Sequence, residues 1–272
     1  MGWGRGVLAL CGTICCILSF ICSMKSTWFY GMNTVDDLYT HIVQDLEEAG
    51  KISAYAADAN EPDPRYKAYG VRASGKQQIF QKYRALIRKL EHEQQIGLAE
   101  QLIQSKFGEQ QSLGLRILEP LASHYSSYNF HQLDELVRCL YGWSKVDEFT
   151  GSLLRDVLFR NPDTFPTVVR TWNQDADQWL RRTSVVLFTR KIASSGLFND
   201  FALEMCNNLI YAPEALVQKG VGWALKDLMR SDKERILDYV LHLRRQNVSK
   251  TITSYAIRDL SGPEKKDFLA RT

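Results

Sequence analysis

The sequence predicts an all-α protein whose helices stack in pairs as an α-solenoid. Apolar residues recur at helical spacing in one segment after another, and the segments are of similar length. No stretch of useful length alternates apolar and polar residues as a half-buried strand would, and no Asn-Gly hairpin signal occurs. Paired helices with short connections favour a HEAT-like repeat solenoid, because stacked pairs curve and create a concave face. A compact helical bundle is the alternative.

The individual helices follow from apolar spacing and from the residues that interrupt it. The first predicted helix runs from Val35 to Leu46 and ends near Gly50. Residues 54–75 contain two prolines and two glycines and are predicted to be an irregular connection. Later segments end at Gly, Asn, Pro or a short polar turn. They are residues 76–91, 93–106, 109–123, 130–142, 145–160, 163–172, 177–193, 197–210, 213–230, 232–246 and 249–260.

Composition is that of an ordinary globular protein, so it does not by itself indicate a nucleic-acid binder. The chain has 272 residues, 45% hydrophobic and 24% charged, and a formal net charge of +3. The charge is unevenly distributed: residues 141–272 hold 20 Lys and Arg against 16 Asp and Glu, whereas residues 25–140 hold 13 against 15. A modestly basic second half is compatible with a phosphate-facing surface, and equally with ordinary solvated helix faces.

Cysteine and histidine placement gives no metal signal. Four of the six cysteines crowd the first 22 residues, and the five histidines are scattered along the chain. No set of these residues has the spacing of a zinc site. Cys139 and Cys206 lie in apolar helical patterns and are predicted to fill core space. We therefore expect no bound metal.

The first 31 residues allow three interpretations. Residues 7–24 are nearly uncharged and rich in Leu, Ile, Cys and Phe, as in a signal peptide or a short membrane anchor. The third interpretation is that translation starts at Met24 or Met32 and that the stretch is upstream sequence. We favour this one, so that residues 32–272 form a single domain of a cytoplasmic, nucleoid-associated protein. If residues 1–24 are real, the protein is membrane-anchored or exported.

Three short segments contain the residues that point to chemistry. In the first, a spacing of four places the Trp143 indole and the Asp147 carboxylate on one face of a helix. A flat aromatic surface beside a fixed negative charge suits a substrate that is part sugar and part developing cation. The segments are Gly142-Trp143-Ser144-Lys145-Val146-Asp147, Trp179-Leu180-Arg181-Arg182 and Lys219-Gly220-Val221-Gly222-Trp223-Ala224-Leu225.

In their order and separations these segments resemble the DNA alkylation repair glycosylases of the AlkD type, a family of HEAT-like repeat proteins. The resemblance covers about residues 66–260. The three segments are similar, in turn, to the family's Trp-x-x-x-Asp segment, its Trp-Leu-x-Arg helix and its Lys-x-x-Gly-Trp-x-Leu segment. Arg65-Tyr66 is similar, across an alignment gap, to an aromatic position in the family's N-terminal part.

The resemblance implies a specific activity. Members of this family excise cationic alkylated purines, such as 7-methylguanine and 3-methyladenine, from duplex DNA without a metal or an organic cofactor. The resemblance therefore implies that this protein is a monofunctional DNA N-glycosylase that has a concave DNA-binding face and acts as a monomer. No lysine is placed as a Schiff-base nucleophile, so strand cleavage by the enzyme itself is not expected.

The expected site residues follow from that reaction. An alkylated purine is already cationic, so it leaves without a general acid, and Asp147 is expected to stabilise the oxocarbenium sugar and activate water. Trp143 and Trp223 are expected to form an aromatic wall against the deoxyribose, and Arg182 to hold a backbone phosphate with its planar fork. The remaining substrate-binding candidates are Tyr66 and Lys219, and further backbone contacts are assigned by position to Lys226, Arg181 and Arg190.

These residues also have purely structural interpretations. Asp147 falls in the first turn of predicted helix 145–160, where the helix dipole favours acidic residues. Trp143 and Trp223 lie on apolar helix faces and would equally suit a core. Their assignment to a site therefore depends on the family resemblance.

Arg182 and Trp179 share one predicted helix and are assigned differently. Arg182 would equally suit an exposed ion pair, for example with Asp175 or Asp177. Trp179 lies on the apolar stripe of that helix and is predicted to be part of the core.

Two other functional classes stay open at this point. A non-catalytic HEAT-repeat module could bind damaged or branched DNA through the same basic concave face, with Asp147 serving stability alone. A HEAT-type protein-interaction scaffold tethered to a membrane becomes relevant if the first 31 residues are translated and retained.

Overall fold

The computed structural model describes residues 34–52 and 63–271. The hydrophobic segment for which a signal, an anchor or upstream sequence was predicted lies outside these residues, and so does much of the predicted irregular connection. Among the described helices, none is long and apolar enough to cross a membrane.

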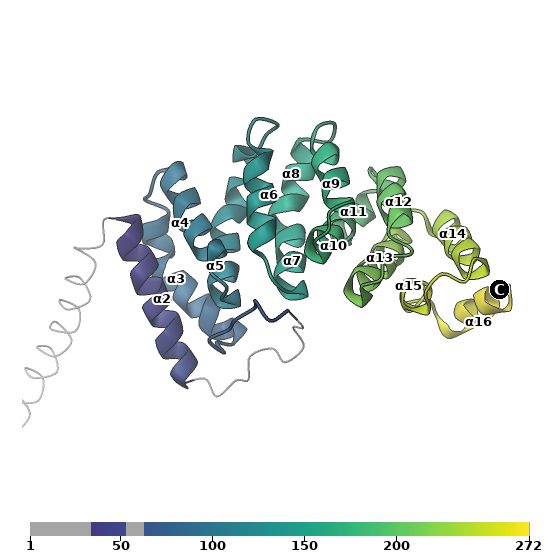
Figure 1. Ribbon diagram of the computed structural model, residues 1–272, viewed down its shortest axis with the longest axis horizontal. Coiled ribbons are helices and arrows are strands. Elements are labelled where there is room, and N and C mark those ends of the chain that lie inside the picture. The colour runs from purple at the N-terminus through teal and green to yellow at the C-terminus, as the bar shows by residue number, and fades with distance from the viewer. Residues whose placement is uncertain (1–33, 53–62, 272) are drawn as a thin grey trace, which may run out of the picture.

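The helices form two rows that run the length of the chain (Figure 1). In each row every helix packs against the next one of the same row. The outer row consists of α2 (Val35–Ile52), α4 (His92–Gln104), α6 (Phe130–Cys139), α9 (Phe165–Asn173) and α12 (Asn199–Asn208). The inner row consists of α3 (Ala73–Ile87), α5 (Gly108–Leu118), α7 (Trp143–Phe149), α10 (Gln178–Val186), α13 (Ala215–Leu228) and α15 (Lys250–Ala256).

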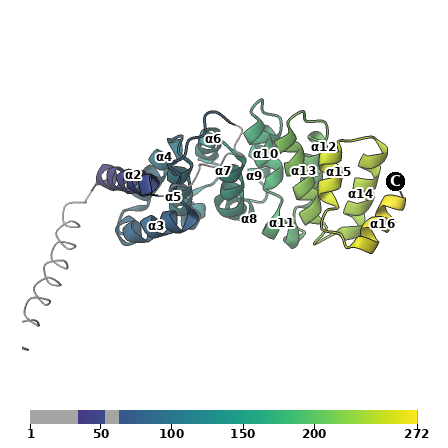
Figure 2. The same cartoon turned by 90° about the horizontal axis from the view of Figure 1, so that it is seen from below.

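The two rows follow an arc from α2 to the C-terminal helices, and the view from below keeps the same order (Figures 1 and 2). This is a HEAT-like α-solenoid, as predicted, and the compact-bundle alternative is wrong. Within the described ranges the chain has no strand, only an isolated bridge between Lys67 and Phe107. The remaining elements are η1 (Glu119–His124), η2 (Thr150–Leu154), α8 (Arg155–Arg160), α11 (Arg190–Ser195), α14 (Lys233–Arg245) and α16 (Gly262–Ala270).

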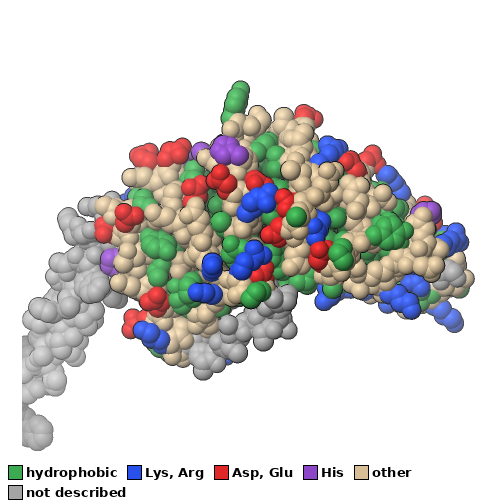
Figure 3. All heavy atoms as spheres, in the orientation of Figure 1, with side chains coloured by type: hydrophobic (Ala, Val, Ile, Leu, Met, Phe, Trp, Pro, Cys, Tyr) green, Lys and Arg blue, Asp and Glu red, His purple; other side chains and the backbone are tan. Residues whose placement is uncertain are grey.

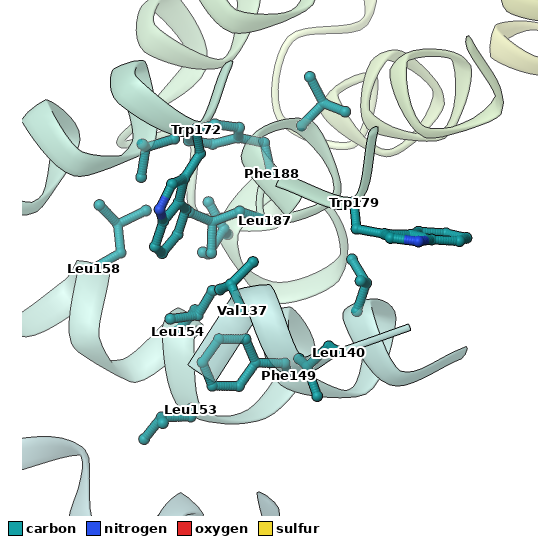
Figure 4. Packing of buried hydrophobic residues seen from close by; sticks show 14 of the residues in the cluster. Val137, Leu140, Phe149, Leu153, Leu154, Leu158, Trp172, Trp179, Leu187 and Phe188 are labelled. Atoms are coloured by element: carbon teal, nitrogen blue, oxygen red, sulfur yellow. The ribbon is translucent and has the colours of Figure 1, made fainter. Parts of the chain in front are cut away.

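A continuous apolar core lies between the two rows. At the centre of the molecule Phe149 and Leu153 pack in one cluster with Trp172 and Phe188, all of them fully buried (Figure 4). Burying a side chain of this size stabilises the fold by roughly 1.5–3 kcal/mol. The core therefore fixes how α7 and η2 sit against α9 and α10, and this arrangement positions the residues on the inner face.

The predicted helix 145–160 is one helical stretch that begins earlier and contains a π-helical segment. α7 begins at Trp143, after Gly142 with a φ of 106°, which a glycine adopts without strain. Residues 150–154 form the π-helical segment η2, and α8 completes the stretch. Because the helix starts at Trp143, the expectation that Asp147 lies in the first turn is wrong, and the helix dipole does not explain this carboxylate.

The predicted helix 177–193 is interrupted. α10 ends at Val186, and α11 begins at Arg190, whose φ of 53° lies in the left-handed region. Such a conformation costs roughly 1–3 kcal/mol for a residue with a side chain, so surrounding contacts must hold it. Those contacts come from the inner face and are described below.

Residues 63–72 form a strap that runs from α10 to the start of α3 (Figure 1). The Trp179 indole, which is buried as predicted, donates a hydrogen bond of 2.7 Å to the Asp63 carboxylate. Arg65 binds the same carboxylate at 2.7 Å and stacks on the ring of Tyr141. The strap is therefore anchored near the centre of the solenoid.

Candidate functional site

The main cleft is a cavity of about 880 Å³ on the inner row. Residues of α7, η2, α10, α11, α13 and α15 line it, so it depends on the stacking of consecutive repeats. The lining residues are Trp143, Ser144, Asp147, Glu148, Gly151, Ser152, Arg182, Arg190, Leu216, Lys219, Trp223 and Tyr255. The first and third sequence segments, and Arg182 of the second, thus meet at one place.

Asp147 and Arg182 form a buried, bidentate pair in this cleft. Arg182 Nε donates to Asp147 Oδ1 at 3.0 Å, and Arg182 Nη2 donates to Oδ2 at 2.9 Å. The third nitrogen, Nη1, donates to the Leu216 carbonyl at 2.5 Å. Only 5% of the Arg182 side chain and 9% of the Asp147 side chain are exposed. The exposed ion pair that was considered for Arg182 does not form: neither Asp175 nor Asp177 is its partner.

The charge state of Asp147 reflects two opposing effects. Burial raises the pKa of the Asp147 carboxyl, and the Arg182 guanidinium opposes this rise by favouring the ionised form. An arginine stays protonated at any physiological pH, so the opposing charge is permanent. The cleft therefore holds a buried carboxyl group that is paired with Arg182 and also lies near the charge of Arg190.

Trp143 and Trp223 are both half-buried and line the main cleft from different helices. The guanidinium of Arg190 lies over the Trp223 ring, 4.9 Å from its centroid. Arg190 Nη1 also donates to the Asp147 backbone carbonyl at 3.2 Å. One arginine therefore joins the second tryptophan to the helix that carries the carboxylate.

Asp227 explains the unusual backbone of Arg190, and sequence reasoning did not find it. Its buried carboxylate accepts the Arg190 backbone N–H at 2.8 Å and the Trp223 indole N–H at 3.2 Å. The signal that could have found Asp227 is its spacing: Trp223 and Asp227 are four residues apart, as are Trp143 and Asp147. The carboxylate fixes both the indole and the turn that presents Arg190.

Gly151 makes room for the Arg190 side chain. A Cβ atom at this position would lie 2.3 Å from Arg190 Nη1. Gly151 belongs to the π-helical segment η2, an irregularity that often occurs at functional sites. The absence of a side chain here lets the guanidinium reach both Trp223 and the Asp147 carbonyl.

The other predicted residues are spread over different places. Lys219 is exposed and lines the main cleft. Arg181 pairs with Glu214, and Lys226 pairs with Asp259 at 2.8 Å, so both are engaged outside the cleft lining. Arg182 uses three of its five N–H donors on protein acceptors, and its predicted phosphate contact stays a prediction.

Tyr66 does not line the main cleft but a neighbouring cavity, here called the second hollow. This hollow of about 530 Å³ lies between the strap, the start of α3 and the start of α7. It shares Ser144 with the main cleft, so the first turn of α7 separates the two. Its lining includes Tyr66, Arg72, Lys76, Glu109, Ser144 and Lys145.

No metal site accompanies these cavities in the part of the chain that the structure describes. There, no group of three or more His, Cys, Asp and Glu side chains is arranged to hold an ion. Fold and site together define the class: a HEAT-like solenoid protein with an aromatic, carboxylate-bearing cleft on its inner face.

Comparison with known proteins identifies the family. The sequence matches the profile of the DNA alkylation repair enzyme family over residues 41–260. The chain belongs to this family. No curated protein sequence matches it significantly.

Two solved structures share the fold at low sequence identity. A predicted DNA alkylation repair enzyme from Enterococcus faecalis has 16% identity and a TM-score of 0.64, over 79% of this chain and 96% of its own. The alkylpurine DNA glycosylase AlkC of Pseudomonas fluorescens, bound to DNA containing an abasic-site analogue, has 15% identity and a TM-score of 0.51, over 89% of this chain and 68% of its own.

Proposed function

We propose that this protein is an AlkD-type, monofunctional DNA glycosylase that hydrolyses the N-glycosidic bond of cationic alkylated purines in duplex DNA. The observation that supports it is the Asp147 carboxylate, held by Arg182 in a cleft lined by Trp143 and Trp223. Family membership supports a role in the repair of alkylated DNA. The DNA complex of the AlkC neighbour supports damaged DNA as the partner of this fold.

Each group has a role in the proposed reaction. The lesion base already carries a positive charge, so it departs as a neutral purine when the glycosidic bond breaks. Asp147 stabilises the positive charge that develops on the sugar and orients the water that attacks it. Trp143 and Trp223 provide aromatic surface against that cationic sugar and limit the access of bulk water.

The Arg182 guanidinium supports this role of Asp147 and also restricts the directions from which a substrate can reach the carboxylate. It favours the ionised form of the carboxylate and fixes its orientation. It also occupies both oxygens, so a sugar or a water must approach the outer lone pairs of the carboxylate, on the side that faces the cleft. A protein donor and a substrate can share these oxygens, because each oxygen accepts two hydrogen bonds.

The same pair favours a second candidate function. A carboxylate that is fully held by an arginine from the next repeat can serve only to fasten α7 to α10. In that case the main cleft is a recognition surface for damaged or branched DNA and performs no chemistry. The two functions differ in what happens to a lesion after it binds.

Free-base release tests the proposal. Purified protein is incubated with methylated duplex DNA that contains 7-methylguanine and 3-methyladenine, and the released bases and abasic sites are quantified. We expect both to appear in equal amounts and the strand to stay intact without alkali. Tight binding with no release above the spontaneous rate would instead assign the protein to the non-catalytic class.

A further inference from the structure

Two lysine side chains converge in the second hollow on a single hydroxyl group. Lys145 Nζ is buried and donates to Ser112 Oγ, and Lys76 Nζ lies 3.4 Å from the same oxygen. Ser112 Oγ in turn donates to the Glu148 carboxylate at 2.8 Å. Two ammonium groups are therefore held close together, that of Lys145 buried and that of Lys76 half-buried.

The acidic groups nearby form no ion pair with Lys76. Glu148 pairs with Lys145 at 2.7 Å, so it neutralises one of the two lysines. The Glu109 carboxylate accepts the backbone N–H groups of Tyr69, Gly70 and Val71 on the strap, so it attracts Lys76 through its charge but makes no direct contact with it. Lys76 has no ion-pair partner among the described residues.

The protonation behaviour of these groups agrees with repulsion between the two ammonium groups. Burial and the neighbouring Lys145 ammonium both lower the pKa of Lys76. Burial alone would raise the pKa of Glu148, but Lys145 and the Ser112 hydroxyl outweigh it and lower this pKa. An anion in the hollow would relieve the repulsion between the two lysines.

The surroundings of the hollow add further donors for an anion. The 15-residue helix α3 begins there at Ala73, and its N-cap residue Arg72 provides no side-chain acceptor for the free N–H groups of the first turn. Those groups and the helix dipole attract an anion. Near the centre of the face shown in Figure 3, Lys and Arg side chains lie among Asp and Glu side chains.

We propose that the second hollow binds a backbone phosphate of the DNA strand whose lesion nucleotide occupies the main cleft, with Lys76 as its principal ligand. This inference rests on the proposed DNA substrate. The two cavities lie on either side of the first turn of α7 and share Ser144, as expected of sites for neighbouring parts of one strand. Lys145 and the start of α3 complete the phosphate site.

The salt dependence of DNA binding tests this proposal. Binding constants for an undamaged duplex are measured over a range of KCl concentrations for wild type, Lys76→Gln and Lys76→Arg. Removing one phosphate contact should reduce the slope of log Kobs against log salt by about 0.9, and Lys76→Arg should keep the wild-type slope. A wild-type slope in Lys76→Gln overturns the proposal.

Lys82→Gln is the matched control. Lys82 lies on the same helix, but its ammonium pairs with Asp45 of α2, 2.7 Å away, and takes no part in the second hollow. Lys82→Gln should therefore leave the slope of log Kobs against log salt unchanged. If Lys76→Gln and Lys82→Gln reduced the slope equally, the change would reflect the net charge of the protein, and the proposal would be overturned. Thermal unfolding of each variant verifies that it is folded.

Two further readouts separate the possible explanations. The first is the binding of inorganic phosphate, followed by phosphorus NMR. If phosphate binding requires Lys76 but the salt dependence of DNA binding does not, the hollow binds free phosphate, and the assignment to a DNA phosphate is overturned. A Lys76-dependent slope in a protein that releases no base would support the phosphate site and contradict the glycosylase proposal alone.

Discussion

Arg182 holds the Asp147 carboxylate with two nearly equal hydrogen bonds, from Nε at 3.0 Å and from Nη2 at 2.9 Å. Both side chains are almost fully buried, so removal of either one leaves the other charge with little access to water. An uncompensated buried charge is expensive, whereas an exposed ion pair contributes little. The pair therefore has a measurable consequence for stability that is separate from any role in catalysis.

Replacing Arg182 with alanine should lower the free energy of unfolding by about 3–5 kcal/mol, because it leaves the Asp147 carboxylate buried and unpaired. Urea denaturation measures the change. Arg170→Ala is the matched control: Arg170 pairs with Glu204 at 2.7 Å, but both side chains are more than 40% exposed, so the loss should be about 0–1 kcal/mol. Adding Asp147→Asn to Arg182→Ala should recover part of the stability. Equal losses in the two arginine variants would contradict the buried pair.

Of the predicted site residues, five line the main cleft and Tyr66 does not, and how they pair was not predicted from the sequence. The five are Trp143, Asp147, Arg182, Lys219 and Trp223. Spacing within one helix, as between Trp143 and Asp147, is visible in a sequence because it depends on local geometry alone. The contact between Asp147 and Arg182 joins residues 35 positions apart, and it depends on how α7 and α10 stack. For the same reason Asp227, which holds the backbone of Arg190 across the inner row, was not predicted as a partner of Arg190.

Individual helices show where periodicity succeeds and where it fails. The apolar pattern predicted a continuous helical stretch over residues 145–160, and this is confirmed, although η2 within it is π-helical. The same pattern predicted an unbroken helix over residues 177–193, and this is wrong. The interruption at residues 187–189 depends on Arg190, whose φ of 53° is held by a carboxylate on α13. A tertiary contact here overrides a local preference.

Gly151→Ala tests the coupling of η2 to Arg190. The added methyl group would collide with Arg190 Nη1 and should displace the guanidinium from Trp223 and from the Asp147 carbonyl. A cation–π contact of this kind is worth roughly 1–2 kcal/mol, so base release should slow by about tenfold. Stability should stay the same or fall slightly, because the better helix preference of alanine, up to about 1 kcal/mol, only partly offsets the lost contacts of Arg190. Single-turnover release and urea denaturation measure the two effects.

Gly97→Ala provides the control for this substitution. Gly97 lies in α4 of the outer row, and a Cβ atom there would meet nothing within 4 Å. The variant should gain a similar helix preference, up to about 1 kcal/mol, and release base at the wild-type rate. If Gly151→Ala also released base at the wild-type rate, Arg190 would have no part in the reaction.

At the scale of the whole molecule, the solenoid brings distant segments to one surface. The inner helices α7, α10, α13 and α15 each contribute one or a few side chains to the main cleft, and the stacking order determines their separations. The strap extends this surface towards α3, because Trp179 and Asp63 join parts of the chain that are 116 residues apart. A long inner face suits a long, regular partner such as a duplex, whose backbone can follow successive repeats.

The rate of base release by Asp147→Asn, measured beside its DNA affinity, tests the central claim most directly. Wild type, Asp147→Asn and Asp200→Asn, an exposed control, are compared under single-turnover conditions on one methylated duplex. We expect Asp147→Asn to bind DNA with nearly wild-type affinity and to release base about 100- to 1000-fold more slowly, and Asp200→Asn to match wild type. Equal release by Asp147→Asn and wild type would contradict a catalytic role for this carboxylate.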